Sequence, residues 1–355
     1  MKQKLVTTIV YIFFACRFTG LTSYYVKKNS QGAVFKTTKL SRCVNIAILI
    51  IIATFFVKFD QCVLSKDAIE TVSSHIAHLM FFIYFVVLLT MTNLKQRHIV
   101  QTFEKIIIFD NFINEVTGHN IDVSKILKYY VVGKCLGVPV IAALHMLING
   151  LRNVIAVSCF LRFFVVHFII ASGEVLLFCY LVAAINGMKK FNFVLRKRKE
   201  VRIEQIQQML ELCFDIKKDI ESISQIFGFF KLLFSIVEVA TTLYTVLTRL
   251  QKDDVLDYIA NVHWIFELFM QACIFLAPFV IFYKTILETV DICEDIQFSS
   301  AYYKKREMLH LKIGLTPIKF TTYGLLELDW PLIFLMFALI STQLVYLLQF
   351  KQMEK

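Results

Sequence analysis

The chain has 355 residues, of which 57% are hydrophobic and only 18% are charged. A soluble protein carries about 45–50% apolar and about 25% charged residues, so the composition excludes an ordinary soluble domain and predicts a protein of the lipid bilayer. The formal net charge of +11 is explained by lysines and arginines in cytoplasmic loops, and we therefore expect no nucleic acid partner.

The sequence lacks the arrangements typical of an enzyme, a zinc site or a disulfide framework. It contains no Walker loop, HExxH or GxSxG motif, so we expect neither catalysis nor a cofactor. Its nine cysteines are scattered without a CxxC pair, which predicts no metal site. A disulfide between Cys62 and Cys159 is left open, because both residues could lie near one membrane face.

The first residues, MKQKLVTTIVYIFFACRF, combine a basic start with an apolar run from Leu5 to Cys16. This pattern is typical either of a signal peptide or of an amphipathic segment that lies on the cytoplasmic face of the membrane. Small residues do not occupy both cleavage positions, Arg17 follows at once, and the next residues stay basic. These features favour the amphipathic segment.

Seven nearly uncharged stretches follow, and each is predicted to be a membrane-spanning helix. A helix rises about 1.5 Å per residue, so about 20 apolar residues cross a hydrocarbon core about 30 Å thick. The first stretch is short and requires Arg42 and Lys58 to extend their charged ends to the membrane surface. The predicted spans are about 43–58, 74–94, 129–149, 163–187, 229–249, 262–283 and 329–350.

The distribution of lysine and arginine predicts the orientation of these spans. Residues 1–42, 93–128, 188–228 and 284–319 hold 28 of the 38 basic residues, whereas the segments between them on the other side hold 8. Because cytoplasmic segments carry the excess of basic residues, we expect a cytoplasmic N-terminus and an extracellular C-terminus.

Two of the cytoplasmic segments show apolar residues at helical spacing. In 196–228 these include Ile206, Leu210 and Ile220, with charged residues between them. We therefore expect 188–228 and 284–319 to extend the spans as helices and to pack together as an anchor region; the alternative is that they are solvated helices without a role in assembly. No separate soluble domain is evident, so residues 1–355 are predicted to form a single seven-helix, all-α membrane domain.

Two spans contain a carboxylate, Glu174 in the fourth and Glu238 in the fifth. A carboxylate within a span is expensive unless it is paired, and it is therefore either functional or compensated by a basic residue. Lys231 or Lys134 could supply that charge.

The last span keeps several polar side chains, and its end has a recognisable pattern. Thr342, Gln349 and Phe350 resemble the Thr-Tyr-five-apolar-Gln-Phe signature of insect gustatory receptors, a family related to insect odorant receptors. Phe320, Gly324, Leu328 and Asp329 resemble the family's approach to the same helix. The chain departs from the signature at Gln343, where the family has Tyr.

The resemblance implies a tetrameric, ligand-gated, non-selective cation channel in the plasma membrane of insect chemosensory neurons. Four copies of the last span, from identical or related subunits, would line the pore, and Thr342, Tyr346, Gln349 and Phe350 would form the pore and gate. The first three residues lie on one stripe of a helix, with Phe350 beside it. The alternative is that these side chains bond to neighbouring helices within one subunit.

The resemblance also implies a ligand pocket that opens to the outside among the spans. Small-molecule pockets use aromatic faces and a few hydrogen-bonding groups. Seven residues expected in the outer halves of the spans supply such groups: His75, His78, His145, His167, Trp264, Glu267 and Gln271. His75 and His78 share a face, but a metal site needs further ligands at the same depth, so we expect none.

The leading hypothesis is therefore a receptor-channel for extracellular tastants, with a bitter or other plant-derived compound as the default ligand. The alternative is a G-protein-coupled seven-helix chemosensory receptor, which the predicted orientation and the absence of Asp-Arg-Tyr and Asn-Pro-x-x-Tyr motifs disfavour. A transporter would show repeats or paired broken helices, and neither is visible.

Overall fold

The computed structural model is mainly helical and describes most of the chain. The described residues are 4–29, 32–39, 43, 46–48, 50, 68–123, 129–130, 154–197, 202–249, 255–295, 307 and 318–353. The helices are α1 Lys4–Phe18, α3 Ala68–Leu94, α4 Gln96–Thr117, α7 Val154–Arg196, α8 Ile203–Arg249, α9 Val255–Asp295 and α11 Pro331–Met353. Two short antiparallel hairpins join them, β1 Tyr24–Asn29 with β2 Gly32–Thr37 and β3 Thr321–Thr322 with β4 Leu326–Glu327.

Five helical segments among the described residues are long and apolar enough to cross a membrane. They are Thr71–Leu94, Phe168–Arg196, Gly228–Thr248, Val262–Glu294 and Pro331–Met353. They correspond to the second, fourth, fifth, sixth and seventh predicted spans, which confirms the expected class of all-α membrane protein. The third predicted span, 129–149, and most of the first, 43–58, lie outside the described residues.

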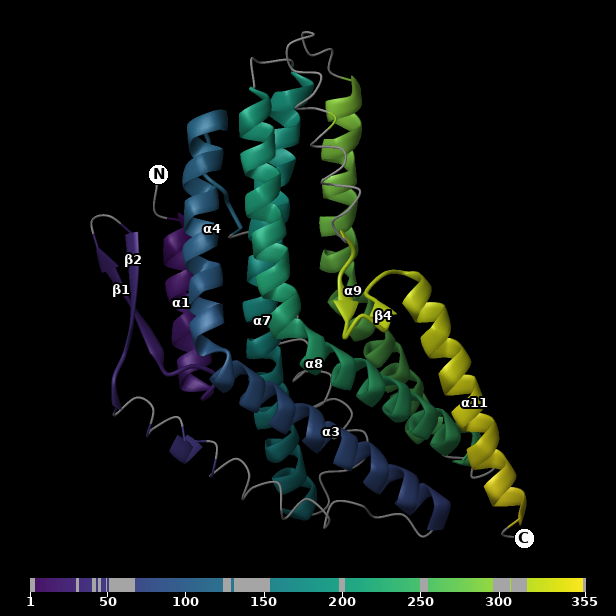
Figure 1. The fold of residues 1–355 in the computed structure, drawn as a ribbon. Helices are drawn as coiled ribbons and strands as arrows, with labels where there is room; N and C mark the ends of the chain where they lie inside the picture. The colour runs from purple at the N-terminus through teal and green to yellow at the C-terminus, as the bar shows by residue number, and fades with distance from the viewer. Residues whose placement is uncertain are drawn as a thin grey trace.

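The helices pack into one bundle, and its upper and lower parts run in different directions. Figure 1 shows α1, α4, α7 and the first part of α8 side by side in its upper half. In the lower half, α3 and the second part of α8 run obliquely towards α11. In α8 a more polar extension, 203–227, precedes the membrane span, whereas the parts of α7 and α9 that were predicted as extensions, 188–196 and 284–295, lie at the ends of their apolar segments.

Bonds between distant residues fix the extensions to one another and to α4. Tyr180 in α7 donates a hydrogen bond to the carbonyl of Ile99 in α4, at 2.9 Å. Lys105 in α4 forms an ion pair with Asp219 in α8, with 2.6 Å between Nζ and Oδ2. Thr289 in α9 donates to the side-chain oxygen of Asn192 in α7, at 2.8 Å. Buried polar groups are thus satisfied between helices rather than left unpaired.

The N-terminal helix α1 packs against the helical bundle. One face of α1, with Leu5, Ile9, Phe13 and Cys16, is buried in the main core. Phe13 contacts Phe103 of α4, with 4.8 Å between ring centroids. The helix α1 is therefore an integral part of the fold, and its place on the cytoplasmic face of the membrane stays a prediction. The two hairpins and the helix α4 were also not predicted.

Close packing of α4 against α7 depends on a residue without a side chain. A Cβ atom at Gly187 would lie 2.8 Å from Cζ of Phe109 and 2.9 Å from Cδ1 of Ile121, well inside van der Waals contact. Gly228 lies within α8, where the nearest atom to such a Cβ is Cζ of Phe275 at an ordinary 3.5 Å.

We expect Gly187→Ala to lower the stability of the receptor by about 1–3 kcal/mol, because the new methyl group overpacks the α4–α7 contact. Gly228→Ala is the matched control and should be neutral or stabilise by up to about 1 kcal/mol, since alanine favours the helix. Melting temperatures of the purified proteins in detergent measure both. Equal melting temperatures for the two variants would contradict the packing argument.

Candidate pore helix and ligand pocket

The last helix, α11, begins at Pro331. Proline suits the first turn of a helix, because a backbone N–H at that position would have no partner within the helix. Only Leu332, Met336 and Ile340 of α11 are buried, and their spacing of four residues makes one narrow stripe. No described residue of α11 after Ile340 is buried. The first half of α11 is therefore buried against its own subunit along one stripe, whereas the second half has no buried residue and its Lys351 lies 5.7 Å from the ring centroid of Tyr244 in α8.

The four predicted pore residues all lie in this second half. Thr342, Tyr346, Gln349 and Phe350 are exposed, Tyr346 to 58% and Phe350 to 54%. Thr342 donates its hydroxyl hydrogen bond to the carbonyl of Ala338 in the same helix, at 2.9 Å. Within the described part of the subunit, none of the four is bonded to another helix, which disfavours the alternative that they join helices inside one subunit.

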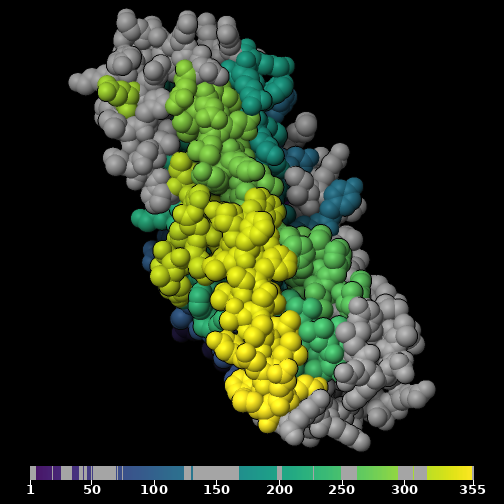
Figure 2. Space-filling model, turned by 90° about the vertical axis from the view of Figure 1, so that its right-hand side faces the viewer, coloured from purple at the N-terminus to yellow at the C-terminus, as the bar shows by residue number. Residues whose placement is uncertain are grey.

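Much of the surface of α11 is apolar and uncovered in the isolated subunit. Figure 2 shows α11 lying across one face of the molecule. Phe334 is 75% exposed, and Phe337 and Val345 are about half exposed. In a membrane such a surface faces either lipid or the same helix of other subunits.

The β3–β4 hairpin ties the start of α11 to the part of α8 that precedes its membrane span. Oε1 of Glu221 in α8 accepts hydrogen bonds from the backbone N–H of Thr321, at 2.9 Å, and from its hydroxyl, at 3.0 Å. Oε2 of Glu221 accepts a hydrogen bond from buried Lys217, at 3.0 Å. The Lys217 ammonium lies 5.4 Å from the ring centroid of Phe320. One carboxylate thus binds the strand and orients the lysine beside it.

Aromatic packing and a second charged group complete this junction. Phe320 is buried against Phe279 and Phe282 of α9, at 5.0 and 5.3 Å between ring centroids. Lys319 donates hydrogen bonds to Glu327 and to Asp329, the second at 3.0 Å. These two carboxylates raise the pKa of Lys319, so it stays charged at physiological pH. The hairpin is therefore fixed to α8 and α9 immediately before α11 begins.

A buried ion pair joins three of the spans. Lys231 in α8 is paired with Glu174 in α7, and both side chains are almost fully buried. Tyr84 in α3 donates its phenolic hydrogen bond to the same carboxylate, at 3.2 Å. Lys231 also lies 5.5 Å from the ring centroid of Phe275 in α9. Of the two interpretations of Glu174, the compensated carboxylate is the one observed.

The second span carboxylate has a different environment. Glu238 is half-buried, and its Oε1 accepts a hydrogen bond from the indole N–H of Trp264, at 3.3 Å. Trp264 shares one face of α9 with Glu267 and Gln271, and Gln271 donates to Glu267 at 2.9 Å. Three of the seven predicted pocket residues thus lie together, with Glu238 added by the tertiary structure.

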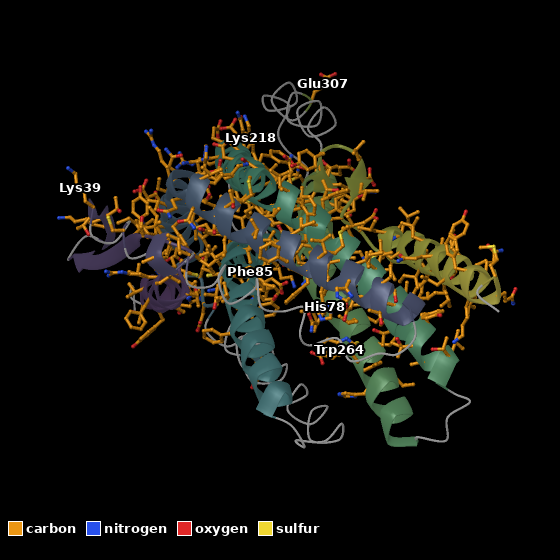
Figure 3. All side chains as sticks on the ribbon, turned by 90° about the horizontal axis from the view of Figure 1, so that it is seen from below. Lys39, His78, Phe85, Lys218, Trp264 and Glu307 are labelled. Atoms are coloured by element: carbon orange, nitrogen blue, oxygen red, sulfur yellow. The ribbon has the colours of Figure 1, made fainter. Side chains whose placement is uncertain are left out.

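The remaining pocket candidates are placed only in part. His75 and His78 lie on α3 and are half-buried, and Nδ1 of His75 is 2.7 Å from the carbonyl of Thr71. In the view from below, His78 and Trp264 are seen in the same region between α7 and α9 (Figure 3). His145, the side chain of His167, Lys134 and the pair Cys62 and Cys159 lie outside the described residues.

An apolar groove lies between α8, α9 and α11. It has a volume of about 370 Å³, and Val239, Phe269 and Phe337 are among its walls. Phe269 and Phe337 bridge α9 and α11, with 5.5 Å between ring centroids. The second half of α8 therefore carries Glu238, which bonds to Trp264, and also lines the groove together with α11, the helix with the predicted pore residues.

The fold and these features define a multi-pass helical membrane protein whose last helix is largely uncovered. The 7tm chemosensory receptor family model matches residues 10–354. The chain belongs to this family, in agreement with the resemblance seen in its last span.

Two solved structures have the same fold. The insect olfactory receptor OR5 from Machilis hrabei is 11% identical, with a TM-score of 0.68, and the likeness covers 97% of this chain and 98% of that chain. The structure of that receptor in complex with eugenol is 12% identical, with a TM-score of 0.59 and the same coverage. A search of curated proteins gives no match.

A double-mutant cycle tests the ion pair between α7 and α8. Glu174→Met leaves the Lys231 ammonium in the bundle without its carboxylate and should cost about 3–5 kcal/mol. Lys231→Met is the other single substitution of the cycle, and the double Met variant, which removes both charges, should be less harmful than either single substitution. Melting temperatures in detergent measure the cycle, and strictly additive effects would show that the two side chains do not interact.

Proposed function

We propose that the protein is a gustatory receptor that acts as a ligand-gated, non-selective cation channel, opened by extracellular tastants. The observation that carries the proposal is the second half of α11, where the polar stripe of Thr342, Tyr346 and Gln349 is exposed in the isolated subunit. Polar side chains of a span face water or a protein interior rather than lipid. Four such helices around one axis would supply that environment.

The chemistry of the stripe suits a weakly selective cation pore. Four Phe350 rings near the axis would form an apolar constriction that loses its water and stays closed. Gln349, one residue away, would present amide oxygens to a cation once the helices separate. Because the amide has no net charge, it discriminates weakly among cations.

The connection of α11 to the rest of the subunit supports a gating role for this helix. Its first turn follows the hairpin that Glu221 holds, and its buried stripe ends at Ile340. The groove of about 370 Å³ beside Phe337 gives the helix room to shift against α8 and α9. A ligand opens such a pore only if it binds the open arrangement more tightly than the closed one.

We expect Phe350→Ala to leak current without ligand, and Gln349→Ala to change conductance or relative permeability more than ligand sensitivity. Leu348→Ala is the control, because Leu348 lies at nearly the same depth as Gln349 but is rotated from it by about 100° around the helix axis. Whole-cell recording with a separate measurement of surface expression checks all three. Wild-type basal current, permeability and ligand response in both Phe350→Ala and Gln349→Ala would remove α11 from the pore.

Assembly is expected to be tetrameric, either of this chain alone or with related subunits, through the extensions of α7, α8 and α9 and through α11. The motivation is the uncovered apolar surface of α11. Mass photometry of the receptor purified in mild detergent should give a species of four subunits. A stable monomer or dimer as the only species would contradict the pore geometry.

A further inference from the structure

Glu238 and Trp264 form the one charged contact between α8 and α9 within the described spans that has no basic partner. Glu238 lies inside the span Gly228–Thr248, and Trp264 lies near the start of the span Val262–Glu294. The indole N–H donates to Oε1 at 3.3 Å. No lysine or arginine of the described residues forms an ion pair with Glu238. Glu174, one helix away, differs because Lys231 neutralises it.

The position of Glu238 is costly unless something else compensates its charge. A carboxylate in a span is retained where it pairs with a cation or faces a cavity that water or a ligand can enter. Glu238 and Trp264 are each only partly buried in the subunit. A neutral indole N–H orients a carboxylate but does not neutralise it.

The two side chains are complementary to one kind of ligand. A carboxylate attracts a positive charge, and an indole is the best aromatic ring for binding an organic ammonium group through its face. Neither group discriminates in favour of a neutral or an anionic compound. The neighbouring Glu267 and Gln271 on the same face of α9 add acceptors and a donor around the same position.

We infer that Glu238 and Trp264 recognise an organic ammonium cation, a positively charged amine carried on an apolar or aromatic body. The inference rests on the proposed function, since it names the chemical class of tastant that the Glu238–Trp264 pair would bind. An inorganic cation would satisfy the charge of Glu238 but would not need the indole.

The tryptophan content of the chain gives a direct test that needs no channel current. The chain has two tryptophans, Trp264 and Trp330, so Trp330→Phe leaves Trp264 as the sole indole reporter. Full-length Trp330→Phe receptor in lipid nanodiscs is titrated with benzyltrimethylammonium while tryptophan emission is recorded. Parallel titrations use neopentylbenzene, in which a carbon atom replaces the charged nitrogen, and sodium chloride at equal ionic strength.

We expect a saturable change of emission with benzyltrimethylammonium, and affinity at least about tenfold weaker for the neutral compound. Sodium chloride should give no saturable change. Glu238→Gln keeps an oxygen that accepts the indole hydrogen bond but loses the charge, and it should weaken ammonium binding by about tenfold or more. Glu104→Gln, the same change at an exposed position of α4, should bind as the parent does.

Equal binding of the charged and neutral compounds, an unchanged affinity in Glu238→Gln, saturation by sodium alone, or no saturable change at all would overturn the inference. The comparison of the two isosteric compounds uses the parent receptor, so it decides the question even if Glu238→Gln does not fold. Ammonium binding without any ligand-gated current would refute the proposed channel function but not the ammonium site. Currents evoked only by neutral compounds, without ammonium binding, would refute the ammonium site but not the channel function.

Discussion

The hydrogen bonds of Glu221 determine how the last helix is attached to the receptor. One carboxylate, in the part of α8 before its membrane span, binds both the backbone and the hydroxyl of Thr321 and orients buried Lys217 beside Phe320. The β3–β4 hairpin is thereby fixed, and α11 starts from a defined point. Without this attachment, the three buried residues of α11 would be its main link to the subunit. Because the first half of α11 is fixed to the subunit, the exposed second half is held at a defined position, where its side chains can have a function.

The helix α8 connects the attachment of α11, the buried ion pair and the Glu238–Trp264 contact. The part of α8 before its membrane span carries Glu221 and contacts α4 through Asp219. Within the membrane, Lys231 neutralises Glu174, and Glu238 meets Trp264. A change at the Glu238–Trp264 pair therefore acts on the same helix that packs against α11 along the apolar groove. This continuity gives a physical route from a bound ligand to the last helix.

The two span carboxylates show how the same residue type takes different roles. In a low-dielectric environment an ionised carboxylate must be compensated. Glu174 obtains a lysine and a tyrosine from two other helices and holds them together. Glu238 obtains one neutral donor and keeps accessible surface. A buried carboxylate with a counter-charge indicates a structural role, whereas a partly exposed carboxylate without a counter-charge indicates a role in recognition.

The sequence by itself determined the membrane class, the described spans and the family, because hydropathy and the motif from Thr342 to Phe350 are local properties of the chain. It also selected Trp264, Glu267 and Gln271 as pocket candidates in the outer half of one span, because they supply aromatic and hydrogen-bonding groups. It did not predict α4 or the hairpins, whose stability comes from packing rather than from a continuous apolar run.

Only the tertiary structure decided which distant side chains meet. Lys231 pairs with a carboxylate 57 positions away, and Glu221 binds a strand 100 positions away. The sequence left Glu174 with either Lys231 or Lys134, and it did not show that one face of α1 is buried in the core. Such contacts depend on the rotation and tilt of whole helices, which are set by the packing of many side chains at once and leave no periodic signal in the chain.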